Sequence, residues 1–172
     1  MEFFPETINN WIRTGFLEYA PPGGFSVGYV IMGKSVATIY LYDAGYEWIR
    51  PGPDSKEVLE QFEAAKAELR VVAAGNPGCA LIRHHGDEVI RLSADPKASQ
   101  ANMATYEVRF EDGSGYLTQL FLTATTNLLV KVRLTIDCMD EALMQDIGHL
   151  LAWVDVLART FRAAAAEKTS MN

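Results

Sequence analysis

The chain has 172 residues, and 49% of them are hydrophobic, which is enough to bury a sizeable core in one domain. Its 22 acidic and 15 basic residues give a net charge of -7, which opposes binding to nucleic-acid backbones and anionic lipid surfaces. No stretch approaches the ~20 apolar residues of a membrane span. We therefore expect no nucleic-acid partner, no membrane span, and one domain over residues 1–172, with a core at about 16–162 and peripheral segments at 1–15 and 163–172.

The amino-terminal segment carries charged residues where a signal peptide needs an uninterrupted apolar core. We expect a soluble protein, cytoplasmic as the sequence stands, or periplasmic or secreted if a signal peptide has been removed. Cys79 and Cys138 lie far apart, and neither has a Cys or His neighbour at the spacing of a metal finger. Two buried thiols and a single disulfide both remain open.

The first third of the chain predicts a loosely defined start and then a hairpin. Residues 5–12 are compatible with a short helix, and residues 16–19 fit a strand equally well. Residues 21–24, with the sequence Pro-Pro-Gly-Gly, form a firm break. Residues 25–31 and 36–43 are rich in Val, Ile and Tyr and flank the turn-like residues 32–35, which indicates two paired strands.

A helix is predicted after the loop at residues 43–53. Asp54 is placed to cap it, with Glu57 in the position of a capping box. An apolar stripe follows at helical spacing, and a left-handed cap in the Gly-Asn-Pro-Gly sequence of residues 75–78 is expected to end the helix. The stripe consists of Val58, Phe62, Ala65, Leu69 and Val72.

The second half predicts strands and one long helix. Residues 80–85 and 88–93 flank Gly86-Asp87, a dipeptide typical of a hairpin turn, and residues 94–104 are expected to form a surface loop. Residues 105–136 alternate apolar and polar side chains, which indicates a three-stranded antiparallel meander. Asp137 is the expected cap of the last helix, with Asp140 in its first turn. The apolar stripe of that helix consists of Ile147, Leu150, Leu151, Val154, Leu157, Ala158 and Phe161.

This order predicts an α+β fold, with an antiparallel sheet of about six or seven strands packed by two main helices. The sequence Gly-Phe-Ser-Val-Gly-Tyr at residues 24–29, the strand at residues 40–43 and the layout over residues 24–162 resemble the PsbP-like α/β/α sandwich superfamily. Val30 departs from the superfamily pattern, in which Pro and a nearby Trp often follow the aromatic residue of the first strand. The resemblance implies a noncatalytic accessory module that docks onto a protein assembly or binds a small partner. It carries over no site residue.

Candidate catalytic or metal-binding residues are few. His84 and His85 lie beside Asp87 and Glu88, but adjacent residues of a strand point to opposite faces, which argues against a shared metal ion. No sequence motif for a nucleophile or a phosphate-binding loop is present. We therefore predict no catalytic residues, no metal and no cofactor. A small enzyme or metal protein that uses His84, His85, Asp87 or Cys79 is the alternative.

Aromatic residues supply the candidate binding site. Tyr40 and Tyr42 share one face of their strand, Tyr29 is expected beside them on the neighbouring strand, and Tyr46 and Trp48 follow in a loop. Tyr and Trp offer broad, rigid contact area with a polar group, and interfaces are enriched in them. The competing interpretation is that these rings only anchor the core and the loop.

Charged residues on the predicted meander allow two interpretations. Glu107, Arg109, Lys131 and Arg133 are expected to form a cross-strand lattice on the solvated face. Alternatively, Lys131 and Arg133 bind an acidic ligand.

Three functions remain open from the sequence. The first is a non-enzymatic, acidic interaction or ligand-binding module that uses the aromatic residues to bind a protein partner or a small ligand. The second is an acidic chaperone or immunity-type protein that captures a basic partner, which the net charge of -7 favours. The third is the small enzyme or metal protein. A homodimer is also compatible with an exposed sheet edge.

Overall fold

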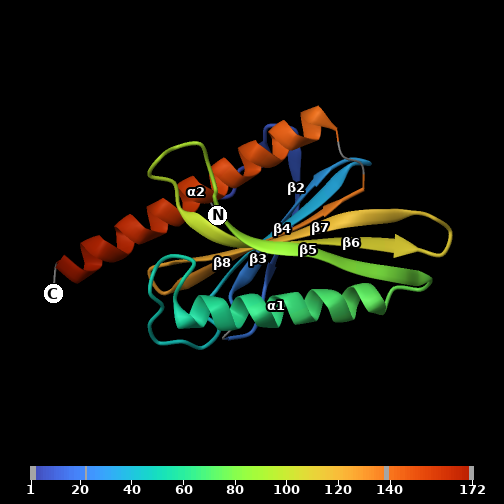
Figure 1. Cartoon of the computed structure of the whole chain (residues 1–172). Helices are drawn as coiled ribbons and strands as arrows, with labels where there is room; N and C mark the ends of the chain where they lie inside the picture. Colours follow the sequence, from blue (N-terminus) through green and yellow to red (C-terminus); the bar gives the residue numbers. More distant parts are fainter. Residues whose placement is uncertain (1–2, 22, 138–139, 171–172) are drawn as a thin grey trace.

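The computed structural model describes residues 3–21, 23–137 and 140–170, with side chains through residue 164. Within these ranges the chain forms one eight-stranded antiparallel sheet with a helix on each face (Figure 1). The α+β class is confirmed, and the strand count is higher than the six or seven expected. The strands are β1 (Thr7–Ile8), β2 (Trp11–Glu18), β3 (Phe25–Ile31), β4 (Ser35–Tyr42), β5 (Cys79–Arg91), β6 (Gln100–Phe110), β7 (Gly115–Thr125) and β8 (Leu128–Ile136), and the helices are α1 (Lys56–Ala74) and α2 (Glu141–Ser170).

Two four-stranded meanders make the sheet. Strands β1 to β4 follow one another in space, as do β5 to β8, and the meanders join where β4 pairs with β8 in the order β1-β2-β3-β4-β8-β7-β6-β5. Helix α1 connects the two meanders and lies below the sheet in Figure 1, whereas α2 lies above it. The two edges of the sheet are therefore formed by β5 and by the short β1 with β2.

The predicted helix at residues 5–12 is wrong, because this segment is the hairpin of β1 and β2. Asn9 has a positive φ of 52°, which Asn tolerates better than most residues, and it forms the tight turn. Trp11 is completely buried and its Nε1 donates a hydrogen bond to the carbonyl of Asp146, 2.9 Å away in α2. Residues 1–15 were expected to be peripheral, yet Phe4, Ile8 and Trp11 are buried in the core.

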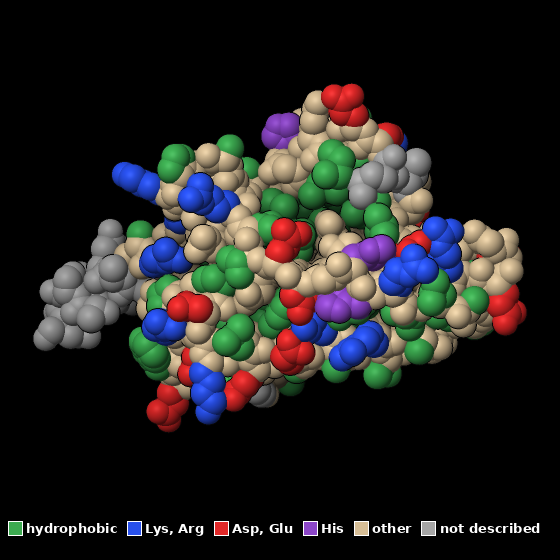
Figure 2. Space-filling view, in the orientation of Figure 1, with side chains coloured by type: hydrophobic (Ala, Val, Ile, Leu, Met, Phe, Trp, Pro, Cys, Tyr) green, Lys and Arg blue, Asp and Glu red, His purple; other side chains and the backbone are tan. Residues whose placement is uncertain are grey.

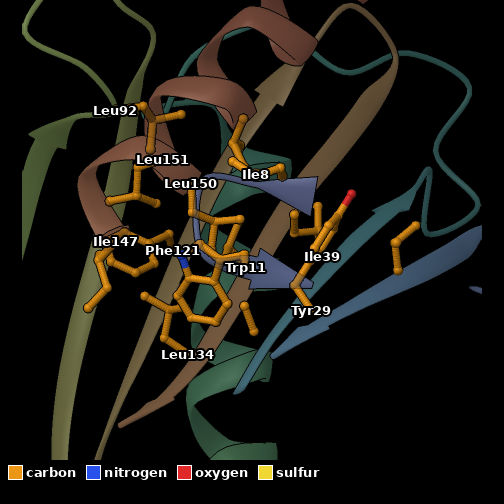
Figure 3. Packing of buried hydrophobic residues seen from close by; sticks show 14 of the residues in the cluster. Ile8, Trp11, Tyr29, Ile39, Leu92, Phe121, Leu134, Ile147, Leu150 and Leu151 are labelled. Atoms are coloured by element: carbon orange, nitrogen blue, oxygen red, sulfur yellow. The ribbon is translucent and has the colours of Figure 1, made fainter. Parts of the chain in front are cut away.

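The larger core lies between the sheet and α2. Figure 3 shows Trp11 of β2 among side chains from the sheet and from α2, including Leu134 and Leu150. The predicted stripe of α2 is buried here, except that Phe161 is only partly buried. Asp140, not Asp137, caps α2, since its Oδ1 accepts a hydrogen bond from the Leu143 N–H at 2.7 Å.

The second core lies between the sheet and α1. Four of the five residues of the predicted stripe are buried, but Val72 is exposed and Ala73 is buried in its place. The cap is Ser55, whose hydroxyl accepts a hydrogen bond from the Val58 N–H at 3.2 Å, and not Asp54. At the other end of the helix Gly75 has a φ of -75°, so the expected left-handed cap does not form there.

Strand β5 corrects a further expectation. Residues 79–91 form one continuous strand along β6, not two strands joined at Gly86-Asp87. Gly86 has a φ of 131° and lies at a shift in register between His84 and Gly86, so it makes a bulge. The segment expected to be a loop at residues 94–104 supplies the start of β6 at Gln100.

Candidate binding surface

Part of the sheet face that carries α1 is not covered by the helix. Helix α1 packs against β5, β6 and β7, at one side of the sheet. On the same face, the strands at the other side present Ile12, Leu17 and Val36 with 51%, 56% and 47% of their area exposed. We call this surface the open face and define it by Ile12, Leu17, Tyr19, Val36, Tyr40, Lys131 and Arg133.

Strand register brings these residues together. In β4, Ala37, Ile39 and Leu41 are buried under α2, so the alternate residues Val36 and Tyr40 point to the other face. Residues that pair across neighbouring strands lie on the same face, so the register adds further residues to the face of Val36 and Tyr40. Val36 pairs with Val30, which pairs with Ile12, and Tyr40 pairs with Lys131 on one side and with Ser26 on the other. Leu17 pairs with Ser26, and the Tyr19 hydroxyl lies 3.0 Å from the Ser26 hydroxyl.

Lys131 is a half-buried cation of the open face, with 16% of its side chain exposed. Its ammonium group lies 4.3 Å from the Tyr40 ring centroid and 5.5 Å from that of Tyr42, and 3.8 Å from the Glu68 carboxylate of α1. Removal from water lowers the pKa of Lys131, although Glu68 opposes this effect. Burial also raises the pKa of the Tyr40 and Tyr42 hydroxyls, so both rings stay neutral.

Arg133 is the accessible cation of the open face. It is half-buried, and its guanidinium group makes no ion pair or hydrogen bond with any residue that the structure describes. Its cross-strand neighbours are Thr38 of β4 and Leu120 of β7, neither of which can neutralise it. An Arg that lacks an internal partner keeps its planar set of donors available for an external carboxylate.

The crevice where the open face meets α1 is small. The crevice between Tyr40, Glu68, Lys131 and Arg133 has a volume of about 20 Å³. That volume holds one water molecule, whereas pockets for small ligands measure about 300–1,000 Å³. The geometry therefore suits a macromolecular surface better than a small ligand.

The structure separates the five predicted aromatic residues. Tyr40 and Tyr42 share a face, as predicted. Tyr29 lies on the opposite face, completely buried beneath α2 (Figure 3), and its hydroxyl donates a hydrogen bond to the Pro5 carbonyl at 3.0 Å. Burial raises the pKa of Tyr29 to about 12. Tyr29 therefore belongs to the core and does not lie beside Tyr40.

Tyr46 and Trp48 lie in the loop between β4 and α1. The Tyr46 hydroxyl donates a hydrogen bond to Glu60 of α1 at 3.1 Å, so this ring fastens the loop to the helix. The loop is also held by Ile49, which is completely buried and exchanges hydrogen bonds with Asn127. Trp48 projects from this anchored loop with 59% of its area exposed.

The alternative site at His84 and His85 is divided between the two faces of β5. His84 Nε2 lies 2.8 Å from Asp87 Oδ1 and its ring stacks on Tyr106, whereas His85 contacts Glu107 at 3.3 Å. Figure 2 shows histidine, acidic and basic side chains over β5. Among the described residues no group of three or more His, Cys, Asp or Glu is placed to hold a metal ion. Cys138 lies outside the described residues, so a disulfide with Cys79 stays untested.

The predicted lattice of charges does not form. Glu107 contacts Arg83, His85 and Arg109 on the face of the sheet that carries α2, whereas Lys131 and Arg133 point to the face that carries α1. The turn between β6 and β7 is formed by Asp112 to Ser114, and its length fixes which residues of the two strands pair. Lys131 and Arg133 therefore do not meet Glu107, with which the sequence interpretation grouped them, and Lys131 contacts Glu68 of α1 instead.

Sequence reasoning missed Ile12, Leu17, Tyr19 and Val36. The sequence carried no clear signal, because the apolar residues of 11–18 occur as adjacent pairs at 11–12 and 16–17 and do not alternate. A register shift between Arg13 and Gly15 in β2 puts Ile12 and Leu17 on the same face. Val36 was assigned to the right strand but not recognised as an exposed residue.

Comparison of the chain with protein-family models, with curated proteins and with solved structures found no match. The resemblance to the PsbP-like superfamily therefore stays a prediction. Neither helix in the described part of the chain is both long and apolar enough to span a membrane.

Proposed function

We propose that this protein is a non-enzymatic accessory domain that binds a partner protein on the open face. One observation carries the proposal: exposed apolar side chains lie beside a guanidinium group that has no partner among the described residues, on a sheet face that α1 leaves uncovered. Apolar area contributes most of the favourable free energy of protein association, and contiguous exposed apolar patches mark interaction sites.

The chemistry of the surface defines the partner. Ile12, Leu17 and Val36 require an apolar surface, and Arg133 requires a carboxylate. Tyr19 and Tyr40 add aromatic area with polar groups, as at many interfaces. We therefore infer a partner surface that combines an apolar patch with at least one Asp or Glu, in contrast to the basic partner of the acidic-capture hypothesis.

The edge of β2 supports the same location. Strand β1 pairs with β2 only at Trp11 and Ile12, and the Arg13 N–H donates to the Glu6 carbonyl at 2.8 Å, so the outer edge of β2 has no neighbouring strand among the described residues from Thr14 to Glu18. An unpaired edge beside an apolar face allows a partner to add backbone hydrogen bonds to side-chain contacts.

The test is a capture experiment with matched variants. The bait proteins are the wild type, the double variant Ile12→Thr/Val36→Thr, the variant Arg133→Gln and the control Arg70→Gln. Thr keeps the β-branched shape at exposed strand positions, and Arg70 is an exposed Arg of α1 that lies outside the open face. A partner that the control retains is then purified, and its dissociation constant is measured for each variant.

We expect the double variant and Arg133→Gln each to weaken binding at least about tenfold, the effect typical of removing an interface residue that contributes more than 1 kcal/mol. The proposal would be contradicted if Arg70→Gln weakened binding as much as the open-face variants do, or if a partner bound all four baits equally. A further bait, Trp48→Ala, tests the aromatic loop, and a partner lost only with this variant would move the interface to that loop. Sedimentation compares the oligomeric state of the wild type with that of the double variant. If the wild type is a dimer and the double variant is a monomer, the partner is a second copy of the chain.

A further inference from the structure

A basin lies at the end of the molecule where the loop before α1, the loop between β5 and β6 and the C-terminal half of α2 meet. Its volume is about 430 Å³, and its lining includes Pro51 to Pro53, Arg91, Pro96 to Gln100 and Arg162. Figure 2 shows several Lys and Arg side chains at this end of the molecule. The basin is on a different part of the surface from the open face, with which it shares no residue.

The basin concentrates positive charge in an acidic protein. Arg91, Lys97 and Arg162 line it, and no Asp or Glu does, although the chain has a net charge of -7. None of the three cationic side chains makes an ion pair or hydrogen bond with the described residues. Three unneutralised cations around one concavity produce a local positive potential that favours an anion.

Three acidic groups beside the lining have their own partners, and the first of them, Asp54, pairs with Arg50 at 3.1 Å. Asp95 accepts a hydrogen bond from Arg159 at 2.9 Å and also accepts from the Lys97 N–H at 2.8 Å. Asp155 accepts from the Ser99 N–H at 2.7 Å and from the Ser93 hydroxyl at 3.1 Å, and it lies 3.6 Å from Arg159. These contacts hold the loop between β5 and β6 against α2, so the walls of the basin are preorganised.

Two buried donors in the lining have no partner. The Ser99 hydroxyl and the Arg162 Nε are shielded from water, and neither makes a hydrogen bond with the described chain. Ser99 is 5% exposed, so its hydroxyl cannot be satisfied simply by bulk solvent. An unsatisfied buried polar group costs free energy unless a ligand or an ordered water completes its hydrogen bonds.

From these observations we propose that the basin binds the phosphate group of a small phosphorylated molecule. Phosphate accepts several hydrogen bonds and prefers the planar donor set of Arg, which Arg91 and Arg162 supply, with Lys97 as a further cation. A volume of about 430 Å³ exceeds what inorganic phosphate requires and falls in the usual range for small-molecule sites, so the remainder of the ligand occupies the space beside Pro51 to Pro53.

The test measures binding of inorganic phosphate and of adenosine monophosphate by isothermal titration calorimetry, with chloride adjusted to keep the ionic strength constant. The variants are Arg162→Gln, Arg91→Gln and the control Arg70→Gln, which removes the same charge from exposed α1. Thermal unfolding without ligand verifies that each variant is folded.

We expect saturable binding of both probes to the wild type, with adenosine monophosphate bound more tightly. Arg162→Gln and Arg91→Gln should each weaken binding about tenfold or more, as for loss of a hydrogen bond to a charged group. Arg70→Gln should have no effect. Absence of saturable binding of either probe, or equal weakening by Arg162→Gln and Arg70→Gln, would overturn the proposal.

Discussion

Lys66 Nζ and Asp87 Oδ2 lie 2.6 Å apart, and this contact joins α1 to the edge strand β5 at its bulge. The Lys66 side chain is only 8% exposed, and its ammonium group also contacts Glu63 at 2.6 Å. Asp87 in turn accepts a hydrogen bond from His84 at 2.8 Å. The bulge at Gly86 thus places Asp87 where it neutralises a buried cation of the helix.

Replacement of Asp87 with Asn should destabilise the protein by about 1 kcal/mol at pH 7. Removing the carboxylate leaves the buried Lys66 with one exposed partner, and the partial exposure of Asp87 limits the cost. Urea unfolding measures the difference in the free energy of unfolding. Glu63→Gln is the matched control, because Glu63 is 67% exposed and its loss should cost less than about 0.5 kcal/mol.

The same pair predicts a pH dependence. Burial opposes ionisation of Asp87, but hydrogen bonds and positive charge from Lys66 and His84 outweigh it and lower the pKa of Asp87 below 3.8. Because the folded pKa lies below the unfolded one, the contribution of Asp87 to stability is present above the unfolded pKa and is lost as the pH falls through the folded pKa. The difference between wild type and Asp87→Asn should therefore shrink as the pH drops below about 4. A constant difference from pH 7 to pH 3 would contradict this.

The cap of α1 is testable with two neighbouring residues. Ser55→Ala should destabilise the protein by about 1 kcal/mol, because it removes the acceptor for the Val58 N–H and Ser55 is buried. Asp54→Ala should change stability by less than about 0.5 kcal/mol, because the Asp54 side chain is 71% exposed and only faces Arg50 across a surface ion pair. Chemical denaturation of both variants measures the two effects. The reverse order would restore Asp54 as the cap.

Gly24 should tolerate no side chain. It has a φ of 67°, and a Cβ atom there would lie 2.0 Å from the Leu41 carbonyl oxygen and 2.7 Å from the Tyr42 Cα. Gly24→Ala should cost about 3 kcal/mol or more, from the left-handed conformation together with displacement of β4. Gly33→Ala is the control, because its φ of 71° is similar but no heavy atom lies within 4 Å of the added Cβ. Its cost should be about 1 kcal/mol. Equal thermal shifts for the two variants would refute the predicted clash.

Lys131→Met should leave stability unchanged or raise it by up to about 1 kcal/mol at pH 7, because Met fills similar space without a charge that must leave water. Burial lowers the pKa of Lys131, so the charged form is disfavoured by folding, and wild-type stability should rise as the pH increases through the folded pKa. The variant should lack that rise. Urea unfolding between pH 7 and pH 10 compares the two proteins. A loss above about 1 kcal/mol at pH 7 would mean that the contacts with Tyr40 and Glu68 outweigh the desolvation.

Local patterns predicted most elements, and the errors have identifiable causes. The stripes of α1 and α2 were correct over most of their length because each helix buries one side against a sheet. Gly86-Asp87 was misread because a bulge and a turn both use a Gly with positive φ, and only pairing with the continuous β6 distinguishes them. The cap of α1 was wrong by one residue, since Asp54 and Ser55 are both suitable capping residues.

The sequence by itself determined the α+β class and the alternation that separates Val36 and Tyr40 from Ala37 and Ile39, because side-chain direction in a strand follows from residue parity. Only the tertiary structure decided which surface stays open. That outcome depends on the pairing of β4 with β8 and on the packing of α1 at one side of an eight-stranded sheet, contacts between residues far apart in the chain. The same long-range pairing puts Tyr29 in the core, leaves Arg133 without a partner in the described part of the chain and brings Arg91 and Arg162 to one basin.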